Sequence, residues 1–267
     1  MKMYISVFKL RFYNGLQYRA AALAGVATQF FWGFLIIMVF QAFYSHAEDT
    51  QPISLPQLTT YVWLQQAFLA FIMLWFRDNE LFQLITSGNI AYELCRPSGI
   101  YNFWYAKLLA QRVSSALLRS LPILGIAFFL PRSYRLSLPP DPATLVLFLV
   151  TLVIGLFVLV SVSMLIYISV FVTMSPVGSL LIFSVAGEFL SGSIIPIPLM
   201  PDWLQNIVRL FPFHLSADFP FRVYSGHIPK EAALAGIVSQ LLWLAFLILV
   251  GRAAMNRALR RVVVQGG

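Results

Sequence analysis

The sequence has few charged side chains. Asp, Glu, Lys and Arg make up only 10% of its 267 residues, and 60% of the residues are hydrophobic. Ordinary soluble domains carry about 25% charged residues. So few polar side chains cannot cover the surface of a water-soluble protein. The mean hydropathy of +0.81 also indicates a strongly apolar chain. The composition therefore excludes a soluble globular protein and predicts an integral membrane protein.

Residues that carry chemistry are also scarce. The single cysteine, Cys95, excludes an internal disulfide. The chain has no Gly-Lys pair, which excludes the GxxxxGK[ST] loop that binds the phosphates of ATP. Its three histidines lack metal-ligand spacing, and no serine lies in a glycine-framed nucleophile elbow. We therefore expect no catalytic residue, no metal site and no cofactor in this chain.

Long apolar runs are abundant. A helix needs about 20 residues to cross a bilayer, and the runs lack the short alternating pattern of a membrane barrel. We therefore predict an all-α bundle of six transmembrane helices. The first run exceeds the 7 to 15 residues of a secretory signal core, so we expect it to be retained. The predicted spans are residues 21–44, 58–76, 105–130, 143–172, 177–195 and 231–251.

The basic residues predict the orientation of these spans, because cytoplasmic flanks are enriched in Lys and Arg. With the N-terminus inside, eleven basic residues face the cytoplasm, five lie outside, and two lie within the third span, which accounts for all 18. Both termini are then cytoplasmic. The formal charge of +8 reflects this topology and attraction to anionic lipid, so we expect no nucleic-acid partner. The cytoplasmic set is Lys2, Lys9, Arg11, Arg19, Arg77, Arg96, Lys107, Arg252, Arg257, Arg260 and Arg261.

The segment 1–20 has apolar residues at helical spacing, Ile5, Phe8, Phe12 and Leu16, with basic and amide residues between them. This pattern favours an amphipathic helix in the cytoplasmic membrane interface. A basic flank that only sets the topology is the alternative.

Segment 77–104 is the longest cytoplasmic connection. It contains the amphipathic piece LFQLI, a turn at Ser87-Gly88-Asn89, and a second short helical piece, IAYEL, that Pro97 ends. Its aromatic and aliphatic residues argue against disorder. We expect it to dock on a soluble partner subunit. The alternative is that Glu93 and Arg96 form only an ordinary i, i+3 ion pair on the surface.

The segment GEFLSGSIIPIPLMPDWLQNIVRLFPF places prolines where the fifth span should end. Pro196, Pro198 and Pro201 cannot all lie within one helix, so we expect a break near Ile195. The residues that follow predict a short re-entrant or interfacial helix at the outer leaflet, within residues 196–213 and including Trp203. Irregular backbone at membrane depth indicates that the segment lines a pathway.

Glu188 lies two turns inside that break, among the small residues Gly187 and Ser191. A carboxylate within a span is costly unless it is paired or neutral. Its natural partners are Arg112 and Arg119, which share one face of the third span at i, i+7. Arg112 can instead extend to the cytoplasmic interface. We favour a salt bridge between spans over direct contact with substrate.

These features together resemble the permease subunit of a type-two ABC exporter. The resemblance rests on six spans, the N-terminal helix, the loop SGNIAYELCRPSG and the proline-rich segment after the fifth span, and it covers essentially the whole chain. The chain length and the sequence SGNIAYELCRP resemble those of the bacterial branch that has two related half-size permease chains. The resemblance implies a place in the bacterial plasma membrane and export of a hydrophobic or amphipathic compound.

The resemblance also implies partners and site residues. Cytosolic ATPase subunits would hold ATP and Mg²⁺, and a second permease chain, related or identical, would complete the pathway. A proton-coupled secondary transporter is the alternative, because Glu188 can carry a proton, but the sequence shows no inverted repeat. The implied coupling residues are Gly88, Asn89, Glu93, Arg96 and Pro97, and the implied pathway and gate residues are Glu188, Ser191, Pro196, Pro198 and Trp203.

Overall fold

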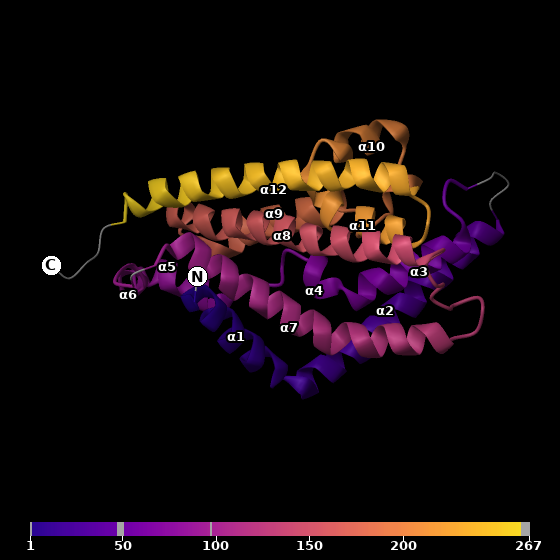
Figure 1. The fold of residues 1–267 in the computed structure, drawn as a ribbon, viewed down its shortest axis with the longest axis horizontal. Helices are drawn as coiled ribbons and strands as arrows, with labels where there is room; N and C mark the ends of the chain where they lie inside the picture. The colour runs from indigo at the N-terminus through magenta and orange to yellow at the C-terminus, as the bar shows by residue number, and fades with distance from the viewer. Residues whose placement is uncertain (1, 47–50, 97, 263–267) are drawn as a thin grey trace.

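The computed structural model describes residues 2–46, 51–96 and 98–262. Within these ranges every regular element is helical, as predicted (Figure 1). Four of the described helices are long and apolar enough to cross a membrane. They are α2 (Arg19–Ser45), α7 (Ile100–Phe129), α8 (Pro142–Thr173) and α12 (Lys230–Leu259).

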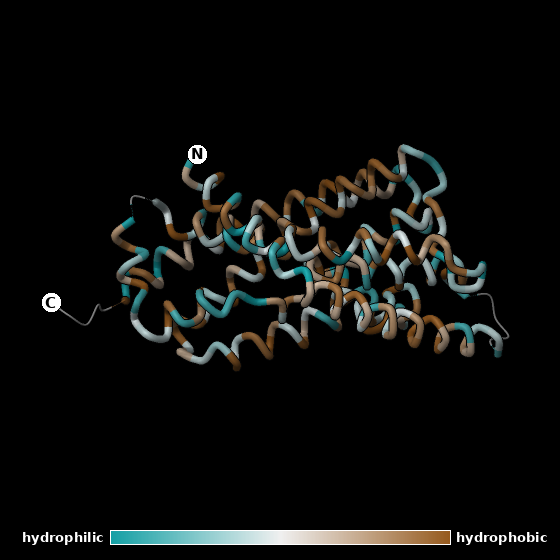
Figure 2. Tube along the Cα trace, turned by 90° about the horizontal axis from the view of Figure 1, so that it is seen from below, coloured by the Kyte–Doolittle hydropathy of each residue, from teal (hydrophilic) through white to brown (hydrophobic). Residues whose placement is uncertain are grey.

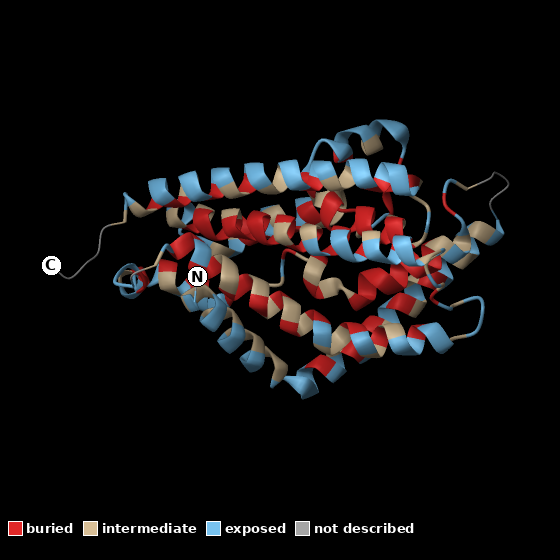
Figure 3. Ribbon diagram, viewed as in Figure 1, coloured by how far each residue is buried: buried red, intermediate tan, exposed pale blue. Residues whose placement is uncertain are grey.

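Helix α8 is the centre of the bundle. Its N-terminus is fixed by Pro142 and by Asp141, whose side chain accepts a hydrogen bond from the Thr144 N–H at 3.0 Å. More than half of its most apolar window is buried. Helices α7, α9, α11 and α12 all pack against it. Figure 3 shows that buried residues follow this centre, whereas the outer side of α12 is exposed, as expected for a surface that faces lipid.

The second predicted span, residues 58–76, is not one helix. Helix α3 (Leu55–Ala67) ends at Phe68, the single turn α4 (Leu69–Ile72) follows, and Met73 is extended. No proline or glycine lies between Leu55 and Phe76 except Pro56, in the first turn of α3. The break therefore corrects the predicted continuous span, and its cause is a contact distant in sequence, described below.

The fifth span is shorter than predicted. Helix α9 (Pro176–Leu190) ends five residues before the expected break at Ile195. Gly192 takes a positive φ of 78°, which glycine adopts without strain, and it turns the chain before the prolines. Four short elements follow in order: η1 (Ile197–Leu199), α10 (Asp202–Arg209), η2 (Pro212–Ser216) and α11 (Asp218–Tyr224). With α9 short and the second run broken, the count of six spans stays a prediction.

Different helices and connections lie at the two ends of the bundle. Helices α5 (Asn79–Thr86) and α6 (Ile90–Leu94) lie at one end, together with the start of α1 (Lys2–Leu16) and the end of α12 (Figure 1). The connections from α7 to α8 and from α11 to α12 lie at the other end. Figure 2 shows long hydrophobic stretches along the helices. We call the two ends of the bundle the α5–α6 end and the opposite end.

Candidate functional site

Residues 78–96 form a compact elbow of α5 and α6 at the end of the bundle. Asp78 begins α5 by accepting a hydrogen bond from the Glu80 N–H at 2.9 Å, and Gly88, at a φ of 76°, turns the chain between the two helices. The apolar face of the elbow, including Leu81 and Ile90, is fully buried. The predicted helical pieces and the turn between them are therefore present.

The elbow is attached firmly to α8. The ring of Phe82 lies 4.4 Å from the ring of Tyr167, centroid to centroid. The Asp78 N–H donates a hydrogen bond to the Tyr167 hydroxyl oxygen at 2.7 Å. These contacts join the elbow to the central helix through buried apolar packing and one polar bond.

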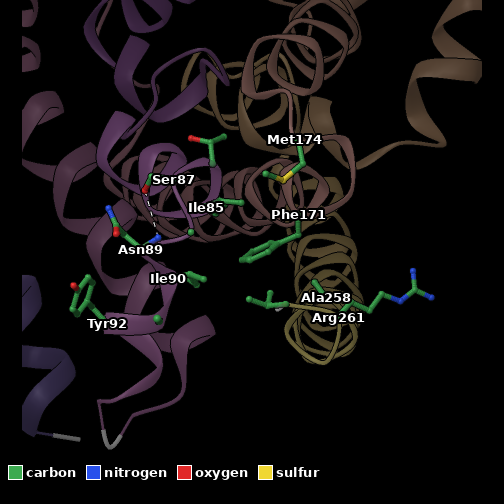
Figure 4. Close-up of a pocket in the computed structure, with 13 residues that line it drawn as sticks. Ile85, Ser87, Asn89, Ile90, Tyr92, Phe171, Met174, Ala258 and Arg261 are labelled. Carbon is green, nitrogen blue, oxygen red and sulfur yellow. Dashed lines mark hydrogen bonds between the residues drawn. The ribbon is translucent and has the colours of Figure 1, made fainter. Parts of the chain in front are cut away.

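A cavity of about 690 Å³ lies beside the elbow. Residues from Ile85 to Tyr92 form one wall, and Phe171, Met174 and Arg261 from the ends of α8 and α12 contribute to the other (Figure 4). Tyr92 is 74% exposed. A surface that joins a cavity to exposed apolar and basic side chains is suited to receive part of another protein.

Five charged side chains connect the elbow to α1 and α7. The carboxylate of Glu93 is buried and lies 3.3 Å from the Arg96 guanidinium and 4.0 Å from the Lys107 ammonium. Lys107 also lies 3.4 Å from Glu80, which accepts a hydrogen bond from Arg11. Sequence reasoning paired Glu93 with Arg96 and missed the other three residues, because they are separated by tens of positions and have no shared local pattern.

The pKa of Glu80 makes this network sensitive to acid. Partial burial raises the pKa of Glu80, but the hydrogen bond from Arg11 and the charge of Lys107 outweigh it and hold the pKa below the ordinary value of 4.5. A carboxylate whose pKa is lower in the folded state stabilises that state at pH values above its ordinary pKa. This stabilisation is lost as the pH falls through the pKa of the folded state.

We therefore expect Glu80→Gln to lower the melting temperature at pH 7 and to lower it less at pH 3.5. Thermal unfolding of both proteins in detergent across this range measures the difference. An effect of Glu80→Gln that is equal at both values would show that the charge of Glu80 does not hold the elbow.

Two other predicted coupling residues, Gly88 and Asn89, lie at the tip of the elbow. A Cβ added to Gly88 would meet no atom within 4 Å, so this residue faces open space. The Asn89 N–H donates a hydrogen bond to the Ser87 hydroxyl at 3.4 Å (Figure 4). Pro97 lies outside the described residues. Gly88, Asn89, Glu93 and Arg96 thus all belong to the elbow.

Arg112 is fully buried and holds the broken second run together. Its guanidinium donates hydrogen bonds to three backbone carbonyls, of Ala70 at 2.8 Å, Met73 at 2.9 Å and Phe76 at 3.1 Å. It also donates to the Ser163 hydroxyl at 3.1 Å. A helix break within a bilayer leaves carbonyls without partners, and an arginine with several donors satisfies them.

This arrangement corrects the predicted role of Arg112, since its donors serve the α4 segment rather than Glu188. Arg119 is half-buried against α2, where a Cβ added to Gly25 would lie 2.9 Å from the Arg119 guanidinium carbon. Within the described part of the chain, neither arginine lies within 4 Å of the Glu188 carboxylate. Glu188 is partly exposed at the end of α9.

The segment that follows α9 is fixed by α3 and α11. The Tyr61 hydroxyl donates to the Gly192 carbonyl at 3.0 Å, and the Gln65 amide donates to the Ser193 carbonyl at 2.5 Å. The Ile197 N–H donates to the buried Asp218 carboxylate at 3.4 Å. Sequence reasoning missed these side chains because each lies at least 20 residues from the segment that it holds.

Most of the predicted gate residues belong to this segment or lie beside it in the sequence. Ser191, Pro196 and Pro198 are buried, and Pro198 lines a cavity of about 340 Å³ together with Phe40 and Phe43 of α2. Trp203 is the second residue of α10 and is 64% exposed, outside that cavity. The structure therefore buries Ser191 and the two prolines and leaves Trp203 exposed.

No curated protein matches the chain. A family model described as "ABC-2 family transporter protein" matches residues 30–266, which include α7, α8, α9, α12, the elbow and the segment after α9. The chain therefore belongs to the ABC-2 transporter family.

Proposed function

We propose that this chain is the membrane-spanning subunit of an ATP-driven exporter in a bacterial plasma membrane. Its family membership makes it a transmembrane component of an ABC transport system. ATP and Mg²⁺ would bind to separate cytosolic ATPase subunits. The observation that carries the proposal is the elbow of residues 78–96, which presents a cavity at one end and is joined by charges and packing to α1, α7 and α8.

The elbow has the properties of a coupling device. Its outer tip, at Gly88 and Tyr92, is open to a partner, whereas Glu93 at its base is buried against Lys107. The ring of Phe103 on α7 lies close to two cations, with its centre 4.9 Å from the Arg96 guanidinium and 5.1 Å from the Lys107 ammonium. A movement of a docked ATPase would therefore reach the long helices without melting the elbow.

The orientation follows from the same feature. Basic residues gather at the α5–α6 end, where α1 begins and α12 finishes (Figure 1). We assign this end to the cytoplasm, so that both termini and the elbow face the ATPase.

A second permease chain, identical or related, would cover the exposed faces of α2 and α9. Helix α9 packs on α8 and η2, and its other side exposes Leu181, Ile182 and Val185. Helix α2 exposes Phe31 and Trp32. Two chains that meet along these helices would enclose a path lined by apolar side chains, which suits a hydrophobic or amphipathic substrate.

Glu188 and Ser191 would line that path at its outer part. Both lie where α9 ends, next to the fixed segment that contains Pro196 and Pro198. Partial exposure of the Glu188 carboxylate within one chain leaves it available to a substrate or to the second chain. Rearrangement of the bonds that Tyr61 and Gln65 make would open this outer mouth.

Inside-out membrane vesicles test the proposal against proton-coupled transport. With a fluorescent amphipathic dye as probe, we expect accumulation that requires ATP and is lost when the catalytic glutamate of the partner ATPase is changed. Glu188→Gln should lower the rate while leaving assembly with the ATPase unchanged. Dye movement driven by a pH gradient alone, and abolished by Glu188→Gln, would establish the secondary transporter instead.

A further inference from the structure

A second cavity, of about 570 Å³, lies between α1, α7, α8 and α12. We call it the α1–α12 groove. Its walls are apolar, and they are formed by Ile5, Phe8, Leu109, Phe157, Leu244 and Ile248. Its volume is within the range of 300–1,000 Å³ that is typical of ligand sites. The groove is separate from the elbow cavity and from the segment after α9, and the proposed transport mechanism does not use it.

The groove has one polar end. Arg252 and Asn102 line it there, and the Arg252 guanidinium donates a hydrogen bond to the Asn102 side-chain oxygen at 3.1 Å. The Arg252 guanidinium also lies 5.9 Å from the centre of the Tyr101 ring. Among the described residues, no carboxylate lies within 4 Å of Arg252. The groove therefore carries a positive charge with no protein counterion.

The walls of this groove are held in place. A Cβ added to Gly251 would come within 2.8 Å of the Tyr101 ring, so α12 and α7 approach closely beside the polar end. The Tyr105 hydroxyl donates to the Phe157 carbonyl at 2.7 Å, which fixes α7 to α8 along the groove. The groove thus exists before any ligand binds, and filling it requires no rearrangement of these helices.

Depth in the membrane limits what can occupy it. Arg252 directly follows the apolar run 231–251, so it lies at the level of the lipid headgroups. The apolar walls begin at this level and extend toward the bilayer centre, because Leu244 and Ile248 lie two turns and one turn before Arg252 on α12. A soluble anion would leave these walls empty, and an uncharged apolar ligand would leave Arg252 without a partner.

We propose that the α1–α12 groove binds an anionic phospholipid of the leaflet at the α5–α6 end. The lipid phosphate would contact Arg252 and the Asn102 amide, and one acyl chain would lie between Leu109, Phe157 and Leu244. The lipid would fill the space between the N-terminal helix and α12, which have no large direct contact. This proposal does not depend on ATP-driven transport.

Native mass spectrometry of the purified full-length chain, with any subunit that copurifies, tests the site. The protein is delipidated in mild detergent and titrated with phosphatidylglycerol or phosphatidylcholine of identical acyl chains. We expect one tightly held phosphatidylglycerol and a preference over phosphatidylcholine of about fivefold, the factor that one basic residue near an anionic headgroup provides. Arg252→Gln should abolish the preference.

Three further variants distinguish binding in the groove from a general attraction of lipid to the protein. Leu244→Trp fills the groove and should remove the tightly held lipid of either kind, provided that the melting temperature shows a folded protein. Ile248→Phe serves the same purpose if Leu244→Trp does not fold. Arg257→Gln removes an exposed charge of α12 that does not line the groove, and it should leave binding unchanged.

Two results would overturn the proposal. One is equal retention of phosphatidylglycerol by the wild type, Arg252→Gln and the groove-filling variant. The other is loss of the bound lipid on addition of inorganic phosphate alone, because that outcome would show an anion site without an acyl-chain component.

Discussion

Replacing Arg112 with leucine is expected to destabilise the chain more than any other single substitution within its spans. The change removes four hydrogen bonds and leaves the buried carbonyl of Ala70 and the partly buried carbonyls of Met73 and Phe76 without this partner. Each unsatisfied buried group costs about 1–3 kcal/mol, so we expect a loss of at least about 3 kcal/mol. Thermal unfolding in detergent, followed by size-exclusion chromatography, measures the effect.

Arg119→Leu is the matched control, since it makes the same change in the same helix. Arg119 makes no side-chain hydrogen bond among the described residues and is only half-buried, so the control should lower the melting temperature much less. Arg112→Lys should fall between the two, because an ammonium has fewer donors than a guanidinium and no fork geometry. Similar losses for Arg112→Leu and Arg119→Leu would refute the role that we give to Arg112.

Reversing the charge of Glu93 is expected to abolish coupling to the ATPase. Glu93→Arg would place a third cation beside Arg96 and Lys107 at a buried position. The base of the elbow would open while the long helices stay packed. In proteoliposomes that contain both subunits, we expect substrate-stimulated ATP hydrolysis to fall by about tenfold or more, the effect of about 1.4 kcal/mol in the coupling step.

Glu231→Arg provides the control for this substitution. It is also a carboxylate reversal, but Glu231 is exposed in the first turn of α12 at the opposite end of the bundle. Glu93→Gln keeps the side-chain size and should give a smaller loss of coupling than Glu93→Arg. Full coupling in both Glu93 variants would mean that the elbow is not the docking site.

The elbow and the helix ends were predictable because their signals are local. Gly88 marks the turn within the elbow, Pro142 and Asp141 begin α8, and the prolines after Ile195 exclude a continuing helix. Apolar run length indicated a helical membrane protein for the same reason. Each of these features depends on residues within a turn or two of one another.

The broken second span was not predictable from local sequence. Nothing between Phe68 and Met73 disfavours a helix, and the break is stabilised by Arg112, which lies 42 residues from Ala70. The same limit applies to the charge network, where Lys107 and Glu80 are 27 residues apart. The sequence suggested Glu188 as the partner of Arg112 because both are charged, whereas backbone carbonyls, which every residue carries, proved to be its acceptors.

Cross-linking from Cys95 is the most direct test of the central claim that the α5–α6 end docks an ABC ATPase. Cys95 is the single cysteine of the sequence and is exposed next to α6, so a thiol-reactive photo-cross-linker can be attached without any mutation. The comparison variant is Cys95→Ser/His227→Cys, which moves the probe to the opposite end. We predict an adduct from Cys95 with a protein whose peptides include a phosphate-binding GxxxxGK[ST] loop, and none from position 227. An ATPase adduct from position 227 alone, or labelling of Cys95 by a membrane-impermeant maleimide in intact cells, would contradict it.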